Sequence, residues 1–214
     1  MPPTRITVLI SGNGTNLQAL IDACAASTIP DAEIIQVISN RKAAYGLQRA
    51  EKASIPTYYH NLIGYKKENP GLEESMLREG YDEALAQIVL KEMPHIVVCA
   101  GWMHILAPTF LNPIANAGVP VINLHPALPG HFNGAGAIER AYEEFKKGNI
   151  TKTGVMVHYV ISEVDMGEPI LVREIDIKPG ETIQDLEQKI HRVEWEIIVE
   201  GTKVAIERIR LIDP

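Results

Sequence analysis

Cysteine is scarce in this chain of 214 residues, and no stretch of it has the length and apolarity of a membrane span. Its two cysteines, Cys24 and Cys99, lie in a helix-like and a strand-like segment and give no disulfide framework. No apolar run approaches the roughly 18 residues that a membrane span requires. No apolar signal-peptide region precedes the first predicted strand. We therefore expect a protein of the reducing cytoplasm that has no membrane partner.

Basic residues are in deficit as well. Lys and Arg number 20 against 27 Asp and Glu, which gives a formal net charge of −7. This balance argues against a broad basic surface, so we expect no nucleic-acid partner. An anionic small molecule would have to be held locally, by backbone N–H groups and a few arginines. Repeats and flexible linkers are also missing, and the length fits a single domain, 1–214.

The order of apolar runs predicts an α/β fold. Strand-like and helix-like stretches alternate through the first half, which is typical of a Rossmann-like, mostly parallel central sheet with helices on both faces. After Gly148 a strand pair is followed by a long helix that begins near Thr182, with Asp185 three residues on as in a capping box. The predicted strands are 6–10, 34–39, 95–100, 121–124, 154–160 and 169–177, and the other predicted helices are 16–26, 45–53, 72–91 and 137–147.

A glycine-rich turn, Ser11-Gly12-Asn13-Gly14-Thr15-Asn16-Leu17, follows the first predicted strand and opens the first helix. Free N–H groups and the positive end of the helix dipole favour an anion at such a point. The turn is not a dinucleotide fingerprint, because Leu17 stands in the place of the third glycine, and it lacks the Gly-Lys-Ser/Thr of a Walker loop. A phosphate site is one interpretation, and a tight turn with an Asn or Thr cap is the other.

A second motif, Asn123-Leu124-His125-Pro126, closes a predicted strand. Residues two apart on a strand point to the same side, so Asn123 and His125 project together at the carboxyl end, where open α/β sheets bind ligands. An imidazole exchanges protons near neutral pH, and an amide hydrogen-bonds an oxyanion. The pair is suited to acyl transfer, with a purely structural histidine as the alternative.

Four segments together give the chain a family resemblance: residues 11–18, 99–103, 123–126 and 164–167. In this order, over nearly the whole length, they resemble the phosphoribosylglycinamide formyltransferases, a folate-dependent family of purine synthesis. The resemblance implies transfer of the formyl group of 10-formyltetrahydrofolate, a co-substrate, to the amine of glycinamide ribonucleotide, without a metal. It implies a phosphate-binding half at about 1–120 and a catalytic, folate-binding half at about 121–214. Both partners are small molecules, and a monomer and a homodimer are both compatible with the sequence.

The resemblance assigns the chemistry to three residues. Asn123 stabilises the tetrahedral oxyanion, and His125 transfers the proton. Asp165 pairs with the imidazole or holds a water, and its charge would favour the charged form of His125. The alternative for Asp165 is a structural Asp-x-Gly turn.

The same resemblance implies the substrate contacts. Gly14, Thr15 and Asn16 would hold the ribonucleotide phosphate, and Glu194 on the last helix would receive the ribose hydroxyls. Without the family, Glu194 would be interpreted as a solvated charge on a helix face. The implied folate contacts are Arg78, Met103, His104, Ile105, Leu106, Asn123 and Asp165.

Two positions depart from the family pattern. His104 stands where bacterial members commonly have arginine, and we expect no mechanistic change from it. Gly136 lies near the place of a family loop histidine. The loop around it is either a mobile flap over the substrate or a turn and cap before the helix at Ala137. His158 matches a family histidine beside the catalytic site and has either a functional or a structural role.

Two other functions are compatible with these motifs. One is a different enzyme that uses 10-formyltetrahydrofolate, either a hydrolase or a formyltransferase acting on a sugar or on methionyl-tRNA. The lack of a basic face disfavours the tRNA substrate. The other is a non-catalytic ligand-binding module. A reaction that requires glycinamide ribonucleotide would distinguish the family activity from the other enzymes that use 10-formyltetrahydrofolate. Any catalytic turnover would exclude a non-catalytic binding module.

Overall fold

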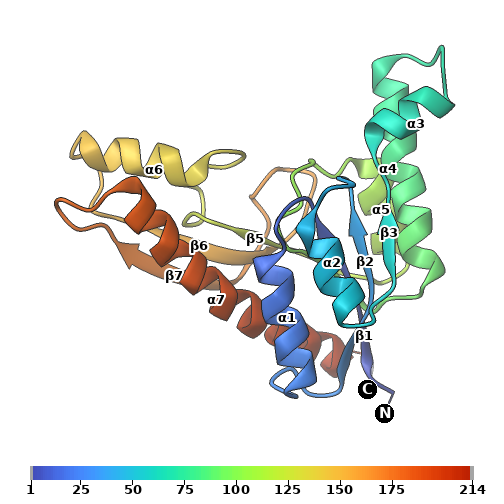
Figure 1. Cartoon of the computed structure of the whole chain (residues 1–214), viewed down its shortest axis with the longest axis horizontal. Helices are drawn as coiled ribbons and strands as arrows, with labels where there is room; N and C mark the ends of the chain where they lie inside the picture. The colour runs from blue at the N-terminus through green and yellow to red at the C-terminus, as the bar shows by residue number, and fades with distance from the viewer. Residues whose placement is uncertain (1, 213–214) are drawn as a thin grey trace. The chain divides into compact units, whose positions relative to one another are not determined.

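The structure is a computed structural model that describes residues 2–212. These residues form two compact units, which meet in the sequence between Val121 and Ile122. Figure 1 shows the helices and strands of both.

The first unit is built on four parallel strands in the order β3-β2-β1-β4. Apolar side chains of the central strand β1 are fully buried, as expected for a strand covered on both faces. Helices α1 and α2 contact each other, as do α4 and α5, and the two pairs flank the sheet (Figure 1). The elements are β1 (Thr4–Ile10), α1 (Thr15–Ala25), β2 (Ala32–Ser39), α2 (Tyr45–Lys52), β3 (Thr57–Tyr59), α3 (Leu62–Glu68), α4 (Glu74–Lys91), β4 (Ile96–Cys99) and α5 (Pro108–Asn116).

The second unit contains three antiparallel strands in the order β5-β6-β7 and a long helix, α7, that packs on β6 and β7. The side chains that α7 buries recur every three or four residues, as its sequence pattern predicts. They include Leu186, Ile190, Ile197, Ile198, Ala205 and Ile206. The elements are β5 (Val121–His125), α6 (Ala137–Lys146), β6 (Lys152–Tyr159), β7 (Pro169–Asp176) and α7 (Ile183–Ile212).

The predicted α/β class is confirmed, including the strand pair and long helix at the end of the chain. The sequence interpretation missed β3, α3 and α5. Strand β3 has three residues and lies at the end of the strand order, and α3 buries none of its residues, so neither has a strong apolar period. Helix α5 starts at Pro108 and contains Pro113, and an internal proline argues against a helix.

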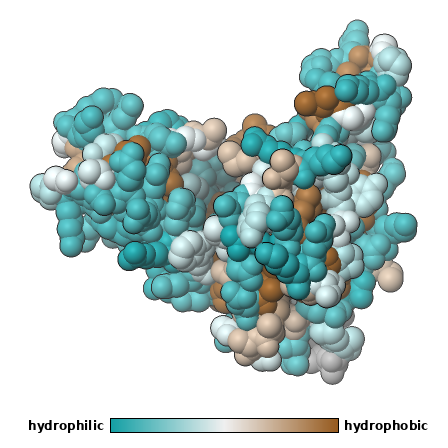
Figure 2. Space-filling view, in the orientation of Figure 1, coloured by the Kyte–Doolittle hydropathy of each residue, from teal (hydrophilic) through white to brown (hydrophobic). Residues whose placement is uncertain are grey.

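The hydropathy of the surface differs between elements. Figure 2 shows a mainly hydrophilic surface over α6 and apolar surface near α3. Exposed apolar residues of this part of the first unit are Ile63, Leu72 and Met76.

The start of α7 carries the predicted cap. The Asp185 N–H donates to the Thr182 hydroxyl at 3.2 Å, and the Thr182 N–H donates to the Asp185 carboxylate at 3.0 Å. These reciprocal hydrogen bonds satisfy backbone donors that the helix itself leaves free.

Replacing the cap hydroxyl should weaken the fold measurably. We expect Thr182→Ala to lower the free energy of unfolding by about 1 kcal/mol, because the Asp185 N–H loses its acceptor. Thr182→Ser keeps the hydroxyl and should lose much less. Urea denaturation of the three proteins measures the difference. An equal loss in the serine and alanine variants would contradict the assigned role of the hydroxyl.

Candidate active site

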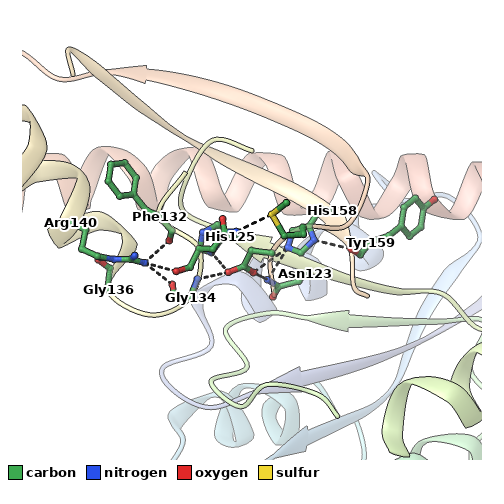
Figure 3. Close-up of polar contacts among 11 residues, drawn as sticks. Asn123, His125, Phe132, Gly134, Gly136, Arg140, His158 and Tyr159 are labelled. Carbon is green, nitrogen blue, oxygen red and sulfur yellow. Dashed lines mark hydrogen bonds and ion pairs between the residues drawn. The ribbon is translucent and has the colours of Figure 1, made fainter. Parts of the chain in front are cut away.

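Strand pairing in the second unit brings three polar side chains to one face of the sheet. Asn123 and His125 are two apart on β5, and β6 places His158 directly opposite Asn123. Residues paired across antiparallel strands share a face, so all three side chains project together. Figure 3 shows this convergence.

Asp165 joins this group from the connection between β6 and β7. Its backbone is left-handed, with φ 56°, a conformation that aspartate tolerates better than most residues. A Cβ on Gly167 would lie 1.7 Å from the Tyr159 carbonyl oxygen, so only glycine lets the turn pass so close to the end of β6. The Asp-x-Gly segment is therefore a turn, as one interpretation held, and this turn also carries the carboxylate to the histidines.

The Asp165 carboxylate lies at the centre of the cluster, with its side chain only 9% exposed. Its Oδ2 accepts the Gly134 N–H at 2.7 Å and lies 3.4 Å from His125 Nδ1. Its Oδ1 lies 3.5 Å from His158 Nε2 and 3.5 Å from Asn123 Nδ2. The structure thus brings together the three predicted catalytic residues, together with His158 and the Gly134 amide.

His158 contacts both the end of β6 and the Asn123 side chain. His158 Nδ1 lies 2.9 Å from the Tyr159 carbonyl oxygen, which can only accept, so Nδ1 carries the proton. His158 Nε2 lies 3.2 Å from Asn123 Nδ2, and this contact engages one amide hydrogen of Asn123 when Nε2 is unprotonated. The other has only the long contact with Asp165 and remains the better candidate donor to a ligand.

Burial decides the charge of His125. Burial lowers the pKa of the imidazole below its ordinary 6.5, and His158 and Arg140 lower it further, although the Asp165 charge and a backbone hydrogen bond with Phe132 raise it. The Asp165 charge thus favours the charged form of His125, as expected, but burial outweighs it and the net shift of the pKa is downward.

For the Asp165 carboxylate, burial and the neighbouring groups also act in opposite directions, but here the neighbouring groups prevail. Burial raises its pKa, but contact with His158, the Gly134 N–H and the nearby His125 outweigh burial and hold the pKa below its ordinary 3.8. Near neutral pH the pair is thus a neutral imidazole beside an ionised carboxylate. Nδ1 of His125 faces the carboxylate, and a backbone hydrogen bond with Phe132 also acts on the imidazole.

Gly136 is the N-cap residue of α6, with left-handed backbone angles of φ 66° and ψ 32°. The interpretation of this loop as a turn and cap before the helix is confirmed. The mobile flap remains a prediction.

The glycine-rich turn lies in the first unit, where α2 supports it. A Cβ on Gly14 would lie 2.6 Å from Gly46 Cα, and the Gly46 N–H donates to the Gly12 carbonyl at 3.2 Å. Arg49, on the same helix, donates from Nη2 to the Asn13 side-chain oxygen at 2.8 Å. Gly14 is the N-cap of α1, and no side chain caps this helix. The interpretation of an Asn or Thr cap is therefore wrong.

Three residues of the predicted folate contacts lie together in the first unit. Arg78 Nη1 lies 3.1 Å from His104 Nδ1, and Arg78 Nη2 donates to the Ile105 carbonyl. The same guanidinium pairs with the fully buried Asp82 at 3.2 Å. Met103 and Ile105 are exposed, and Leu106 is buried.

Glu194 belongs to the second unit. It is 8% exposed on the buried stripe of α7, between Ile190 and Ile197. The interpretation of Glu194 as a solvated charge is therefore wrong.

The thiols do not provide a nucleophile. Burial raises the pKa of Cys24 to about 11 and that of Cys99 to about 12, so neither is a thiolate near neutral pH. Within residues 2–212, no group of three or more His, Cys, Asp or Glu side chains is placed to hold a metal ion. No helix in the described part of the chain is long and apolar enough to span a bilayer.

The sequence interpretation missed two groups that contribute to the site, the Gly134 N–H and Arg140. The Gly134 N–H is a backbone group, which no side-chain motif reveals. Arg140 donates to carbonyls of the loop before α6, and only the loop conformation shows that these acceptors converge. For His158 the resemblance gave a signal, but its partners depend on the strand register.

The fold and this cluster define a class. An α/β protein with a neutral histidine, an ionised aspartate and an amide donor on one sheet face has the groups of an enzyme that moves protons during group transfer. Residues 4–202 match the family described as Formyl transferase, and the chain belongs to this family.

Named relatives cover nearly all of the chain. It is 52% identical over 197 residues to the phosphoribosylglycinamide formyltransferase of Schizosaccharomyces pombe, covering 92% of this chain and 94% of the relative. It is 45% identical over 212 residues to the Saccharomyces cerevisiae protein of the same name, with coverage of 96% and 98%. The crystal structure of glycinamide ribonucleotide transformylase 1 from Symbiobacterium toebii matches with a TM-score of 0.81 at 32% identity, covering 94% of this chain and 86% of that one.

The charge state of His125 can be measured directly. We expect its imidazole to titrate below 6.5, and Asp165→Asn should move the titration to still lower pH, because the charge that raises this pKa is removed while burial remains. NMR of the His125 ring nitrogens measures this titration in the unaltered protein and in the Asp165→Asn variant. Asp176→Asn, on an exposed residue at the end of β7, is the matched control and should leave the titration unchanged. Titration above 6.5, or an upward shift in the Asp165 variant, would contradict the assignment.

Proposed function

We propose that this protein transfers the formyl group of 10-formyltetrahydrofolate to the amine of glycinamide ribonucleotide, as a phosphoribosylglycinamide formyltransferase of de novo purine synthesis. The observation that carries the proposal is the state of His125. Burial lowers the pKa of its imidazole, which is therefore neutral near neutral pH, while its Nδ1 lies 3.4 Å from an ionised carboxylate. The names of the relatives supply the substrates.

The proton transfer uses His125 as a base and then as an acid. When the amine attacks the formyl carbon, its nitrogen must lose a proton, and the neutral imidazole accepts this proton at Nε2. The ionised Asp165 stabilises the imidazolium that results, because an opposite charge beside it favours the charged form. The imidazolium then gives the proton to the folate nitrogen as the bond from that nitrogen to the formyl carbon breaks. No covalent bond to the protein forms.

Besides the positive charge on the imidazole, a negative charge develops on the formyl oxygen during the reaction. In the tetrahedral intermediate the formyl oxygen becomes negative, and the Asn123 amide donates to it from an orientation that His158 has already fixed. The protonated His125 is a further donor. Preorganised donors act without the reorganisation that water would need, which is why the amide orientation matters.

Substrate binding divides among the groups described above. The backbone N–H groups at Gly14, Thr15 and Asn16 hold the phosphate, which fits a helix start that no side chain caps. Glu194 receives the ribose hydroxyls. Arg78 and the stretch from Met103 to Leu106 contact the folate, with the exposed apolar side chains of Met103 and Ile105 available to a flat ring. We place the protein in the cytoplasm, as a monomer or a homodimer.

The test is a spectrophotometric assay of the folate product, run with and without glycinamide ribonucleotide. We expect product only when the ribonucleotide is present. Product without it would indicate a hydrolase, product with a sugar amine in its place would indicate a sugar formyltransferase, and no product under any condition would indicate a ligand-binding module.

Asn123→Ala belongs in the same assay. Loss of one preorganised donor should lower kcat by roughly a hundredfold or more while the apparent constants of both substrates change little. Thr182→Ala, which alters only the cap of α7, serves as the control for lost stability. Near-normal turnover in the Asn123 variant would remove this residue from the mechanism.

A further inference from the structure

The loop before α6 holds an unusual backbone conformation. Phe132, Gly134 and Gly136 have φ values of 50°, 81° and 66°, all in the left-handed region. This conformation turns several carbonyl oxygens of the loop towards one side. Because consecutive carbonyl dipoles that point the same way repel one another, the loop needs a group that neutralises them.

Arg140 on α6 supplies that group. Its Nη2 donates to the carbonyls of Phe132 at 2.6 Å, Asn133 at 2.8 Å and Gly134 at 3.4 Å, and its Nε donates to Gly136 at 3.3 Å. Figure 3 shows the guanidinium reaching into the loop. A planar guanidinium presents several donors in a fixed fork, whereas a lysine ammonium is a single point charge and cannot satisfy four separate acceptors in this geometry.

The loop passes this support on to the catalytic carboxylate. The Gly134 N–H donates to Asp165 Oδ2 at 2.7 Å, shorter than the contacts of that carboxylate with His125 and His158. A second link joins Asn133 Nδ2 to Met166 Sδ at 3.1 Å. The amide that fixes Asp165 is therefore held in place by the same backbone that Arg140 binds.

We infer that Arg140 is a positioning residue, which holds the loop from Phe132 to Gly136 so that the Gly134 N–H aligns Asp165 with His125. It touches neither of these side chains in the described structure and acts through the backbone. Its role in turnover rests on the proposed function, whereas its role in placing the Gly134 amide does not.

The inference has an electrostatic consequence. The charged or titratable groups that act on His125 are Asp165 from the turn after β6, His158 on β6 and Arg140 on α6. Arg140 lowers the pKa of His125, and the Gly134 N–H lowers the pKa of Asp165. Loss of the guanidinium should therefore raise both pKa values and move the acid limb of the pH–rate profile to higher pH.

The experiment compares Arg140→Met, Arg140→Lys and a control. Arg140 is exposed, so both variants should fold. The control is Arg173→Met, which removes an exposed arginine of the same unit that pairs with Glu200. Three measurements are made on each protein: hydrogen exchange of the Gly134 amide, the NMR titration of His125, and kcat and KM across pH.

We expect Gly134 exchange to accelerate at least about tenfold in both Arg140 variants, and kcat to fall about tenfold or more with KM changed less than about threefold. The methionine variant should also show a raised His125 pKa, whereas the lysine variant, which keeps the charge, should stay near the wild type. Arg173→Met should change none of these quantities.

Unchanged Gly134 exchange in Arg140→Met would overturn the inference, as would a kcat loss no larger than that of Arg173→Met. The proposed function fails separately, through absence of ribonucleotide-dependent turnover in the unaltered protein. Accelerated exchange and a raised His125 pKa would still support the positioning role in that case.

Discussion

The second unit depends on one buried carboxylate. The Asp165 side chain is only 9% exposed, and an ionised group that is so buried is costly unless other groups compensate its charge. The compensation comes from a backbone N–H of the loop before α6, from two histidines and from an amide. These groups come from the loop before α6, from β5 and from β6, so the carboxylate is also the point at which these elements and the turn after β6 are held together. A site built in this way tolerates little displacement of any one element.

Burial and charge have opposite effects on His125, and burial prevails. The result is a histidine that starts neutral and becomes charged only when it receives a proton, next to a carboxylate that is already ionised. This order suits a general base, because the imidazole can accept the proton near neutral pH and the stabilising charge is in place beforehand. His158 has a different role from that of His125. Its Nδ1 lies 2.9 Å from the Tyr159 carbonyl oxygen, and its Nε2 lies 3.2 Å from the Asn123 amide, which this contact orients.

The sequence was informative where a residue's neighbours along the chain decide its structure. Alternating apolar runs predicted every strand except β3, and also the long helix. Strand periodicity predicted that Asn123 and His125 share a face, and Thr182 with Asp185 predicted the cap. The sequence was uninformative where contacts between distant segments decide the structure or the charge of a residue. The charge of His125 depends on burial, the partners of His158 depend on strand register, and the convergence of loop carbonyls on Arg140 depends on left-handed backbone angles. Proline obscured α5, and the short β3 and the exposed α3 offered no apolar period. The family resemblance supplied the predicted catalytic residues without giving these geometric reasons.

The central claim is that His125 and Asp165 work as one unit, and a double-mutant cycle tests it most directly. Turnover is measured for His125→Ala, Asp165→Asn and the double variant, with binding of both substrates checked separately. If the two act together, each single change removes most of what the pair contributes. The double variant should then be within about threefold of the more damaged single variant, as found for residues that act as a unit. Losses that multiply across the two changes would show independent action and contradict the account.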